Sequence, residues 1–146
     1  MNNSSLHDEK TFYLLFLHDL MRCQKQVIIE SPFITTQRLR TFDNVFRRLL
    51  EKGVKIYIIT RDPSELNTGY DVQSEEAIRW CESMGIQVFL CLGNHHRKLA
   101  LLDRKILWEG SLNILSQLRS REIMRRIDNK GLTEKMFNFL KLDRFL

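Results

Sequence analysis

The chain has 146 residues, which is the length of a single domain and enough to bury a hydrophobic core. Hydrophobic residues make up 43% of it and charged residues 28%, as in an ordinary soluble globular protein, and no run approaches the roughly 18 apolar residues that span a bilayer. The net charge of +5 favours an anionic partner, either nucleic acid or an acidic membrane surface.

The N-terminal region lacks the marks of a secretory signal, because its polar and acidic start is not a basic leader and no small-residue cleavage site is present. The cysteines are odd in number and have no metal-ligand spacing, so Cys23, Cys81 and Cys91 are interpreted as buried free thiols in a reducing compartment. We therefore expect a cytoplasmic protein without a stable membrane anchor.

Residues 1–8 are expected to be flexible, because they are polar and lie at the chain end. Segments with helical periodicity predict helices at 10–22, 39–52, 72–84 and 133–140, and a further helix is expected to start within 113–117. Short apolar runs bounded by polar residues predict strands at 26–30, 54–60, 87–91, 98–102, 106–109 and 122–127. This alternation predicts one α/β domain over residues 1–146, a layered α-β-α sandwich with a mixed sheet.

The sequence around the strand at 98–102 carries the strongest chemical signal. His96 and Lys98 are two residues apart, so the period of a strand places them on the same face, side by side at one end. A histidine offers a nitrogen nucleophile of near-neutral proton affinity, and a lysine offers a positive charge for a phosphate oxygen. Gly110, Ser111 and Asn113 follow, and they add a flexible turn, a hydroxyl and an amide suited to holding a phosphate.

This pattern resembles the signature of the phospholipase D superfamily, which is H-x-K, four residues, D, six residues and G-S, with an Asn shortly after. The chain has His96, Lys98, Asp103, Gly110-Ser111 and Asn113 at the family spacing. Glu122 fits the Glu that family members carry about ten residues beyond the Gly-Ser turn, and the resemblance covers roughly residues 26–127. Seven fixed positions make a strong motif, and the resemblance implies a phospholipase D-like fold.

The resemblance implies that His96 is the nucleophile, attacking phosphorus to form a covalent phosphohistidine that water then hydrolyses. Lys98, Ser111 and Asn113 would bind the phosphate, although Ser and Asn are also common helix N-caps. Glu122 would hydrogen-bond the other nitrogen of a catalytic histidine, the alternative being an exposed Glu beside arginines.

Two further positions of the motif are interpreted as structural. Asp103 lies an odd number of residues from His96, so strand parity argues against contact with the phosphate and favours a role in fixing a neighbouring strand or loop. Gly110 is expected to let the backbone approach closely. No metal or other cofactor is expected, because no cluster of carboxylates, histidines or cysteines converges in the sequence.

The chain has one copy of the signature, whereas the family's chemistry uses two histidines, one as nucleophile and one as acid and base. We therefore expect a homodimer with the active site at its twofold axis.

The expected activity is metal-independent phosphodiester hydrolysis, most simply of DNA, with RNA as a possible substrate, because short single-signature members of the family resemble nucleases. Basic residues that crowd the motif are candidates to line a nucleic-acid groove, unless they balance acidic neighbours or point away; they are Arg97, Arg104, Lys105, Arg119, Arg121, Arg125 and Arg126. Two alternatives stay open: a phospholipid hydrolase or phosphatidyl transferase of the same superfamily, and a non-catalytic module that binds nucleic acid or dimerises.

Overall fold

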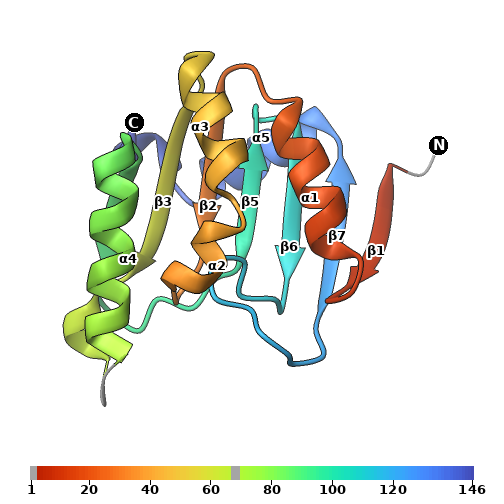
Figure 1. Ribbon diagram of the computed structural model, residues 1–146. Coiled ribbons are helices and arrows are strands. Elements are labelled where there is room, and N and C mark those ends of the chain that lie inside the picture. Colours follow the sequence, from red (N-terminus) through yellow and green to blue (C-terminus); the bar gives the residue numbers. More distant parts are fainter. Residues whose placement is uncertain (1–2, 67–69) are drawn as a thin grey trace.

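The computed structural model describes residues 3–66 and 70–146, which form a mixed seven-stranded sheet of order β1-β7-β6-β5-β2-β3-β4 (Figure 1). The strands are β1 (Ser4–Asp8), β2 (Gln26–Glu30), β3 (Lys55–Arg61), β4 (Gln87–Cys91), β5 (Leu99–Leu102), β6 (Ile106–Gly110) and β7 (Ile123–Asp128). Strands β2, β3 and β4 pair in parallel, and the remaining pairs are antiparallel. The predicted α/β class with a mixed sheet is confirmed.

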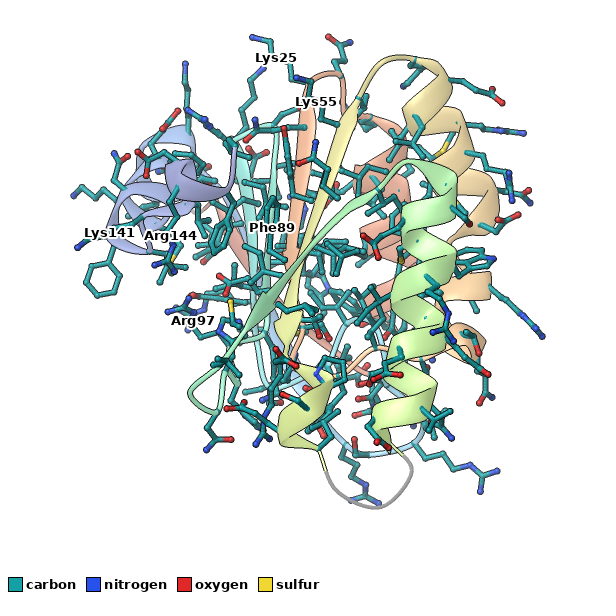
Figure 2. All side chains as sticks on the ribbon, turned by 90° about the vertical axis from the view of Figure 1, so that its left-hand side faces the viewer. Lys25, Lys55, Phe89, Arg97, Lys141 and Arg144 are labelled. Carbon is teal, nitrogen blue, oxygen red and sulfur yellow. The ribbon has the colours of Figure 1, made fainter. Side chains whose placement is uncertain are left out.

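Helices cover both faces of the sheet. One face carries α1 (Phe12–Met21), α2 (Thr36–Arg40), α3 (Asp43–Glu51) and α4 (Tyr70–Met84), whereas the other carries α5 (Lys130–Phe139) and the short 3-10 helix η2 (Leu142–Phe145) (Figure 1). Figure 2 shows these layers edge-on, with Lys141 and Arg144 on the α5 side of the sheet. A further 3-10 turn, η1 (Pro63–Glu65), follows β3.

The alternation of side chains along the central strands divides the core into two clusters. On β2, Val27 and Ile29 pack with α1 and α3, whereas Ile28 packs with Phe137 of α5. Both faces of the central strands are therefore buried, which explains why β2 and β5 appear in the sequence as nearly continuous apolar runs. In the described part of the chain, no helix has both the length and the apolar content to cross a bilayer.

The expected flexibility of the chain start is wrong for residues 4–8, which form β1 and pair antiparallel with β7; residues 1–2 lie outside the described residues. Most of this strand's side chains are exposed, so its apolar pattern gave no strand signal. It is an edge strand held by backbone hydrogen bonds to its neighbour, and sequence periodicity does not report such bonds.

Two helix predictions also need correction. The helix expected over 39–52 is two helices: α2 ends at Arg40, with Thr41 as its C-cap donating its hydroxyl to the Arg38 carbonyl, and Phe42 is the N-cap of α3. The helix expected from Asn113 is a single turn, in which the Asn113 carbonyl accepts from the N–H groups of Ser116 and Gln117. Its apolar side chains Ile114 and Leu115 are fully buried, so the segment follows the core rather than a helical path.

Candidate active site

The antiparallel register of β5, β6 and β7 brings the separated parts of the motif into one row. Lys98, immediately before β5, lies opposite Gly110 at the end of β6, whose N–H donates to the Lys98 carbonyl at 3.3 Å. Ser111 in turn pairs with the start of β7, since its N–H donates to the Ile123 carbonyl at 2.9 Å and its hydroxyl accepts from the Ile123 N–H at 3.0 Å. Glu122, immediately before β7, therefore lies two strands away from Lys98 at the same end of the sheet.

Gly110 permits the close approach of β6 and β7 at this end of the sheet. A Cβ at position 110 would collide with the Ile123 carbonyl oxygen and with the Met124 side chain and backbone. A larger residue would separate the strands where Ser111 and Glu122 are positioned, so glycine is required here for space rather than for an unusual backbone angle.

His96 and Lys98 lie side by side, as their spacing predicts. Lys98 Nζ is 2.7 Å from His96 Nδ1 and donates to the His96 carbonyl at 3.0 Å. Partial burial, followed by the charges of Lys98 and Arg61, lowers the pKa of His96 below its usual 6.5. The ring is therefore neutral at pH 7, the form in which a nitrogen lone pair can attack phosphorus. Nδ1 lies against the Lys98 ammonium, which can only donate, whereas a lone pair on Nε2 needs the ring proton on Nδ1; this contact must open before Nε2 can act as a nucleophile.

Two opposing effects act on the pKa of Lys98. Burial lowers the pKa of Lys98, while the charge of Glu122 opposes this shift. Hydrogen bonds from the side chains of Ser120 and Ser111, and then the charge of Lys98, lower the pKa of Glu122. Lys98, Ser111 and Glu122 thus form one connected polar group. Among the described residues, no hydrogen bond joins Glu122 to the His96 of the same chain, so that contact stays a prediction.

Asn113 lies apart from this polar group. Its Oδ1 atom is buried and has no hydrogen-bond partner among the described residues. It lines a hollow that also contains Phe33, whose ring meets the His96 ring edge-on with centroids 6.1 Å apart. An amide oxygen without a partner is ready to accept a hydrogen bond from a ligand.

Asp103 lies at the end of β5 remote from His96. Its carboxylate accepts the backbone N–H groups of Gln24 and Lys25 at 2.8 Å, and that of Gln26 at 3.0 Å. These bonds hold the turn that leads into β2. Asp103 also has a left-handed backbone conformation, with φ of 54°.

The expected basic groove is only partly present, because several of its residues have other partners. Arg97 pairs with Glu30, Arg126 pairs with Asp19, and Arg104 donates to the Gln26 side chain and lies over the Phe137 ring. Lys105 and Arg126 line a separate hollow with Asp19 and Asp103, at the remote end of β5. Arg119, Arg121 and Arg125 do line hollows that contain Asn113, Ser111 or His96. Arg97, although paired with Glu30, is 43% exposed and lines the same hollow as His96, so the basic surface near the site is made by Arg97 together with these three residues.

Sequence reasoning missed a buried carboxylate beneath the motif. Glu30, at the end of β2, is 0% exposed, and its Oε1 accepts from Arg97 Nε at 3.2 Å and Nη2 at 3.1 Å. His95 Nε2 lies 2.8 Å from the same oxygen, outside hydrogen-bond geometry. Arg97 is therefore anchored to Glu30 and His95 lies against the same carboxylate, while the alternate residues 96 and 98 contact each other. The apolar run of β2 gave no sign that its last residue would serve this role.

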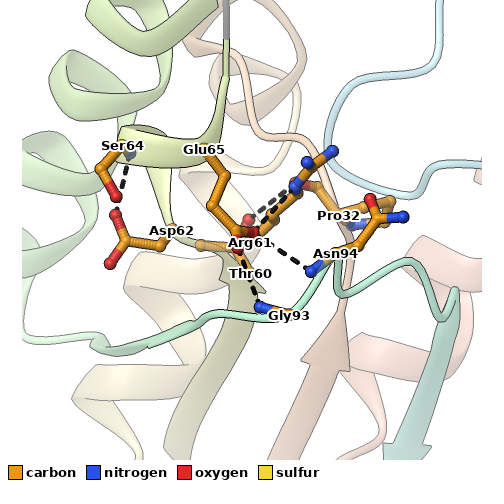
Figure 3. Close-up of polar contacts among 8 residues, drawn as sticks. All are labelled: Pro32, Thr60, Arg61, Asp62, Ser64, Glu65, Gly93 and Asn94. Atoms are coloured by element: carbon orange, nitrogen blue, oxygen red, sulfur yellow. Dashed lines mark hydrogen bonds and ion pairs between the residues drawn. The ribbon is translucent and has the colours of Figure 1, made fainter.

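Arg61 was also missed, because the sequence presents it as the first residue of a turn. It ends β3, and its Nε donates to Glu65 Oε1 at 3.1 Å. Glu65 in turn accepts the N–H groups of Gly93 and Asn94 at 2.9 and 3.2 Å, which ties η1 to the loop that leads to His96 (Figure 3). In the described ranges, no three His, Cys, Asp or Glu side chains converge to hold a metal ion.

The chain is similar to a known protein family and to several solved structures. The family described as cardiolipin synthase, PLD-like domain, matches residues 16–142. A search of curated proteins finds no match. Among solved structures, NucT from Helicobacter pylori is similar at 20% identity and a TM-score of 0.73, covering 94% of this chain and 92% of that one.

Two other solved structures share the fold. Nuc from Salmonella typhimurium, a phospholipase D family member, has 16% identity and a TM-score of 0.75, over 97% of this chain and 94% of its own. Phosphatidylserine synthase from Haemophilus influenzae has 16% identity and a TM-score of 0.71, but the match covers 97% of this chain and only 38% of the synthase.

Proposed function

The chain belongs to the phospholipase D superfamily of phosphodiesterases, through its family of cardiolipin synthase PLD-like domains, and on this basis we propose that it is a metal-independent nuclease acting through a phosphohistidine. The observation that carries the proposal is the His96–Lys98 pair. It combines a ring whose lowered pKa keeps it neutral with a cation 2.7 Å from the ring and an adjacent hydroxyl, that of Ser111.

In the first step, His96 Nε2 attacks phosphorus, and the bond from phosphorus to the leaving oxygen breaks. Lys98 and the Ser111 hydroxyl stabilise the negative charge that develops on the non-bridging oxygens. The leaving alkoxide needs a proton, and the one proton of the attacking ring is on Nδ1, on the side away from phosphorus, so another group must supply it. In the second step, water attacks the phosphohistidine, the P–N bond breaks, and the water's proton needs an acceptor.

A second histidine would meet both needs, and a second copy of the chain would supply it. Within one chain, His95 is held against the buried Glu30 and His7 is bonded to Ser5 and packed on Trp108, so neither is placed as an acid for His96. We propose a homodimer in which two His96 rings face each other across the twofold axis. Glu122 would then accept a hydrogen bond from the partner ring, which is consistent with its lack of contact with its own.

Nucleic acid is proposed as the substrate for two reasons. The chain matches NucT and Nuc over nearly their whole length, whereas it matches little more than a third of the phosphatidylserine synthase. Three arginines, at positions 119, 121 and 125, surround the row of motif residues and can bind backbone phosphates. None of these contacts reads base edges, so we expect little sequence preference.

A phospholipid phosphodiester is the second candidate, and one observation favours it. A hollow of about 620 Å³ extends from His96 and Lys98 over an apolar surface that includes Leu6, Ile123 and Phe139. These three side chains are 72%, 68% and 82% exposed. Acyl chains could occupy such a surface, and so could a second copy of the chain.

The deciding assay measures hydrolysis of single-stranded DNA, duplex DNA, RNA and anionic phospholipid vesicles, each with and without EDTA. We expect turnover of nucleic acid that EDTA leaves unchanged, abolished in His96→Ala and retained in the control His18→Ala, whose residue is exposed on α1. Turnover of vesicles alone would favour the lipid enzyme. Binding without turnover would favour the non-catalytic module.

Subunit mixing tests the shared site. Wild type and His96→Ala are mixed in equal amounts and allowed to exchange. If a site needs two His96 rings, activity should fall to about one quarter of that of the same total amount of wild type, because random pairing makes only a quarter of the dimers fully wild type. A value near one half would indicate independent sites and contradict the shared one.

A further inference from the structure

A large hollow adjoins the catalytic pair on the side of α2 and α4. Its volume is about 1080 Å³, and it lies between the segment after β2, the end of β3 with η1, the first turns of α4 and the segment 113–120. Its walls combine aromatic, amide and cationic side chains, notably Phe33, Gln73, Arg61 and Arg119, with two carboxylates, Glu65, which pairs with Arg61, and Glu76. This volume is sufficient for a nucleotide-sized group.

Two residues connect the hollow to the reaction centre. Phe33 lines the hollow and contacts the His96 ring edge-on. Asn113, part of the phosphate-binding motif, lines it too and has a buried Oδ1 without a hydrogen-bond partner in the described part of the chain. A group attached to a phosphate at His96 would therefore pass over Phe33 and meet Asn113 as it enters the hollow.

Arg61 supplies a positioned cation at the same wall. Its side chain is 20% exposed, and its Nε is occupied by Glu65, which is itself fixed by Gly93 and Asn94 (Figure 3). Within residues 3–66 and 70–146, the two terminal guanidinium nitrogens have no hydrogen-bond partner. A guanidinium held at one nitrogen and open at two is arranged to bind phosphate oxygens in a bidentate manner.

We propose that this hollow is a nucleotide subsite, in which the nucleoside on one side of the scissile phosphate packs on Phe33, donates a hydrogen bond to Asn113, and places its next phosphate on Arg61. The assignment rests on the proposed nuclease function and specifies where one half of the substrate binds. Arg61 is then a binding residue for a second phosphate, whereas Lys98 serves the scissile one.

The test compares two substrates. A single-stranded oligonucleotide fills the hollow and offers a second phosphate, whereas bis(p-nitrophenyl) phosphate has one phosphodiester and no nucleoside. Arg61→Gln should raise the KM for the oligonucleotide about tenfold and lower the ratio of oligonucleotide to small-diester kcat/KM by a similar factor. Glutamine can still donate to Glu65, so the loop before His96 stays tied. Arg48→Gln, an exposed arginine on α3, is the matched control.

A second pair of variants tests the same hollow without changing Arg61, so its result does not depend on how well the fold tolerates Arg61→Gln. Gln73 is exposed on α4 at the wall of the hollow, so Gln73→Glu and Gln73→Lys should fold normally. Gln73→Glu should raise the oligonucleotide KM several-fold at low salt, and Gln73→Lys should lower it, with smaller effects on the small diester.

Three outcomes would overturn the assignment. A wild type that cleaves oligonucleotides, with an unchanged substrate ratio in Arg61→Gln and in both Gln73 variants, would refute the subsite alone. Equal losses on both substrates in Arg61→Gln would place Arg61 at the scissile phosphate or in the fold. A wild type that cleaves the small diester but no nucleic acid would refute the proposed function and the subsite with it.

Discussion

Replacement of Asp103 by alanine should weaken the fold and leave the chemistry nearly intact. The carboxylate accepts three backbone N–H groups, from Gln24, Lys25 and Gln26, at 2.8, 2.8 and 3.0 Å. Each such bond at a partly exposed site is worth about 0.5–1.5 kcal/mol. Alanine must also adopt the left-handed conformation that Asp103 has with φ of 54°, which costs about 1 kcal/mol more for a residue without a short polar side chain.

These contributions predict a loss of about 4 kcal/mol in the free energy of unfolding, and a fall in Tm of about 13 °C for a chain of this size. Asp103→Asn keeps one acceptor oxygen and tolerates the backbone conformation, so it should lose about half as much. Urea and thermal unfolding are measured at one fixed protein concentration, because a dimer's stability depends on it.

The catalytic activity of Asp103→Ala should not change. Asp103 lies at the end of β5 remote from His96, so kcat of the folded variant at low temperature should stay within about twofold of wild type. A fall in kcat of about a hundredfold or more with an unchanged Tm would refute this reasoning and place Asp103 in the catalytic machinery.

Three further results are expected. Gly110→Ala should destabilise the protein by about 2 kcal/mol or more in urea unfolding, since its Cβ would collide with β7; a normal midpoint would show that β6 and β7 can separate freely. The profile of kcat/KM against pH should have its acid limb below 6.5, because burial and then neighbouring positive charges lower the pKa of His96, whose neutral form is the proposed nucleophile. Removal of one charge in Lys98→Gln raises the pKa of His96, so the limb of the residual activity should move to higher pH, and a shift to lower pH would contradict this sign. Glu30→Gln should lower stability by about 3 kcal/mol, because the pair with Arg97 is buried on the carboxylate side, and a variant as stable as wild type in the same denaturation assay would show that the pair is not a structural anchor.

The central part of the fold was predictable because its signals are local. The strands β2 and β4 coincide with the predicted ranges, since each is a short apolar run bounded by polar or turn residues. The sequence did not predict segments whose structure is set by backbone pairing or by burial and that lack the apolar pattern of their element. The exposed edge strand β1 is one such case, and the Asn113 turn, whose apolar residues follow the core, is another.

The site, like the fold, was predictable from the sequence only in part. Spacing alone indicated that His96 and Lys98 are neighbours, because two residues are one period of an extended chain. Their surroundings were not predictable, since Arg61, Phe33 and Glu30 come from other elements and carry no motif. Such contacts depend on strand order, which places β2 beside β5 and β3 beside β2.

The sequence by itself therefore gave the family resemblance, the candidate reacting groups and the hypothesis that one chain holds half of a site. Only the tertiary structure decided which groups surround them: the carboxylate beneath the motif, the hollow beside Phe33, and the pairing that places Arg126 away from the basic surface near His96. The physical reason is that bond geometry along the chain fixes residues two apart, whereas contacts between remote segments are set by the packing of the whole sheet and its helices.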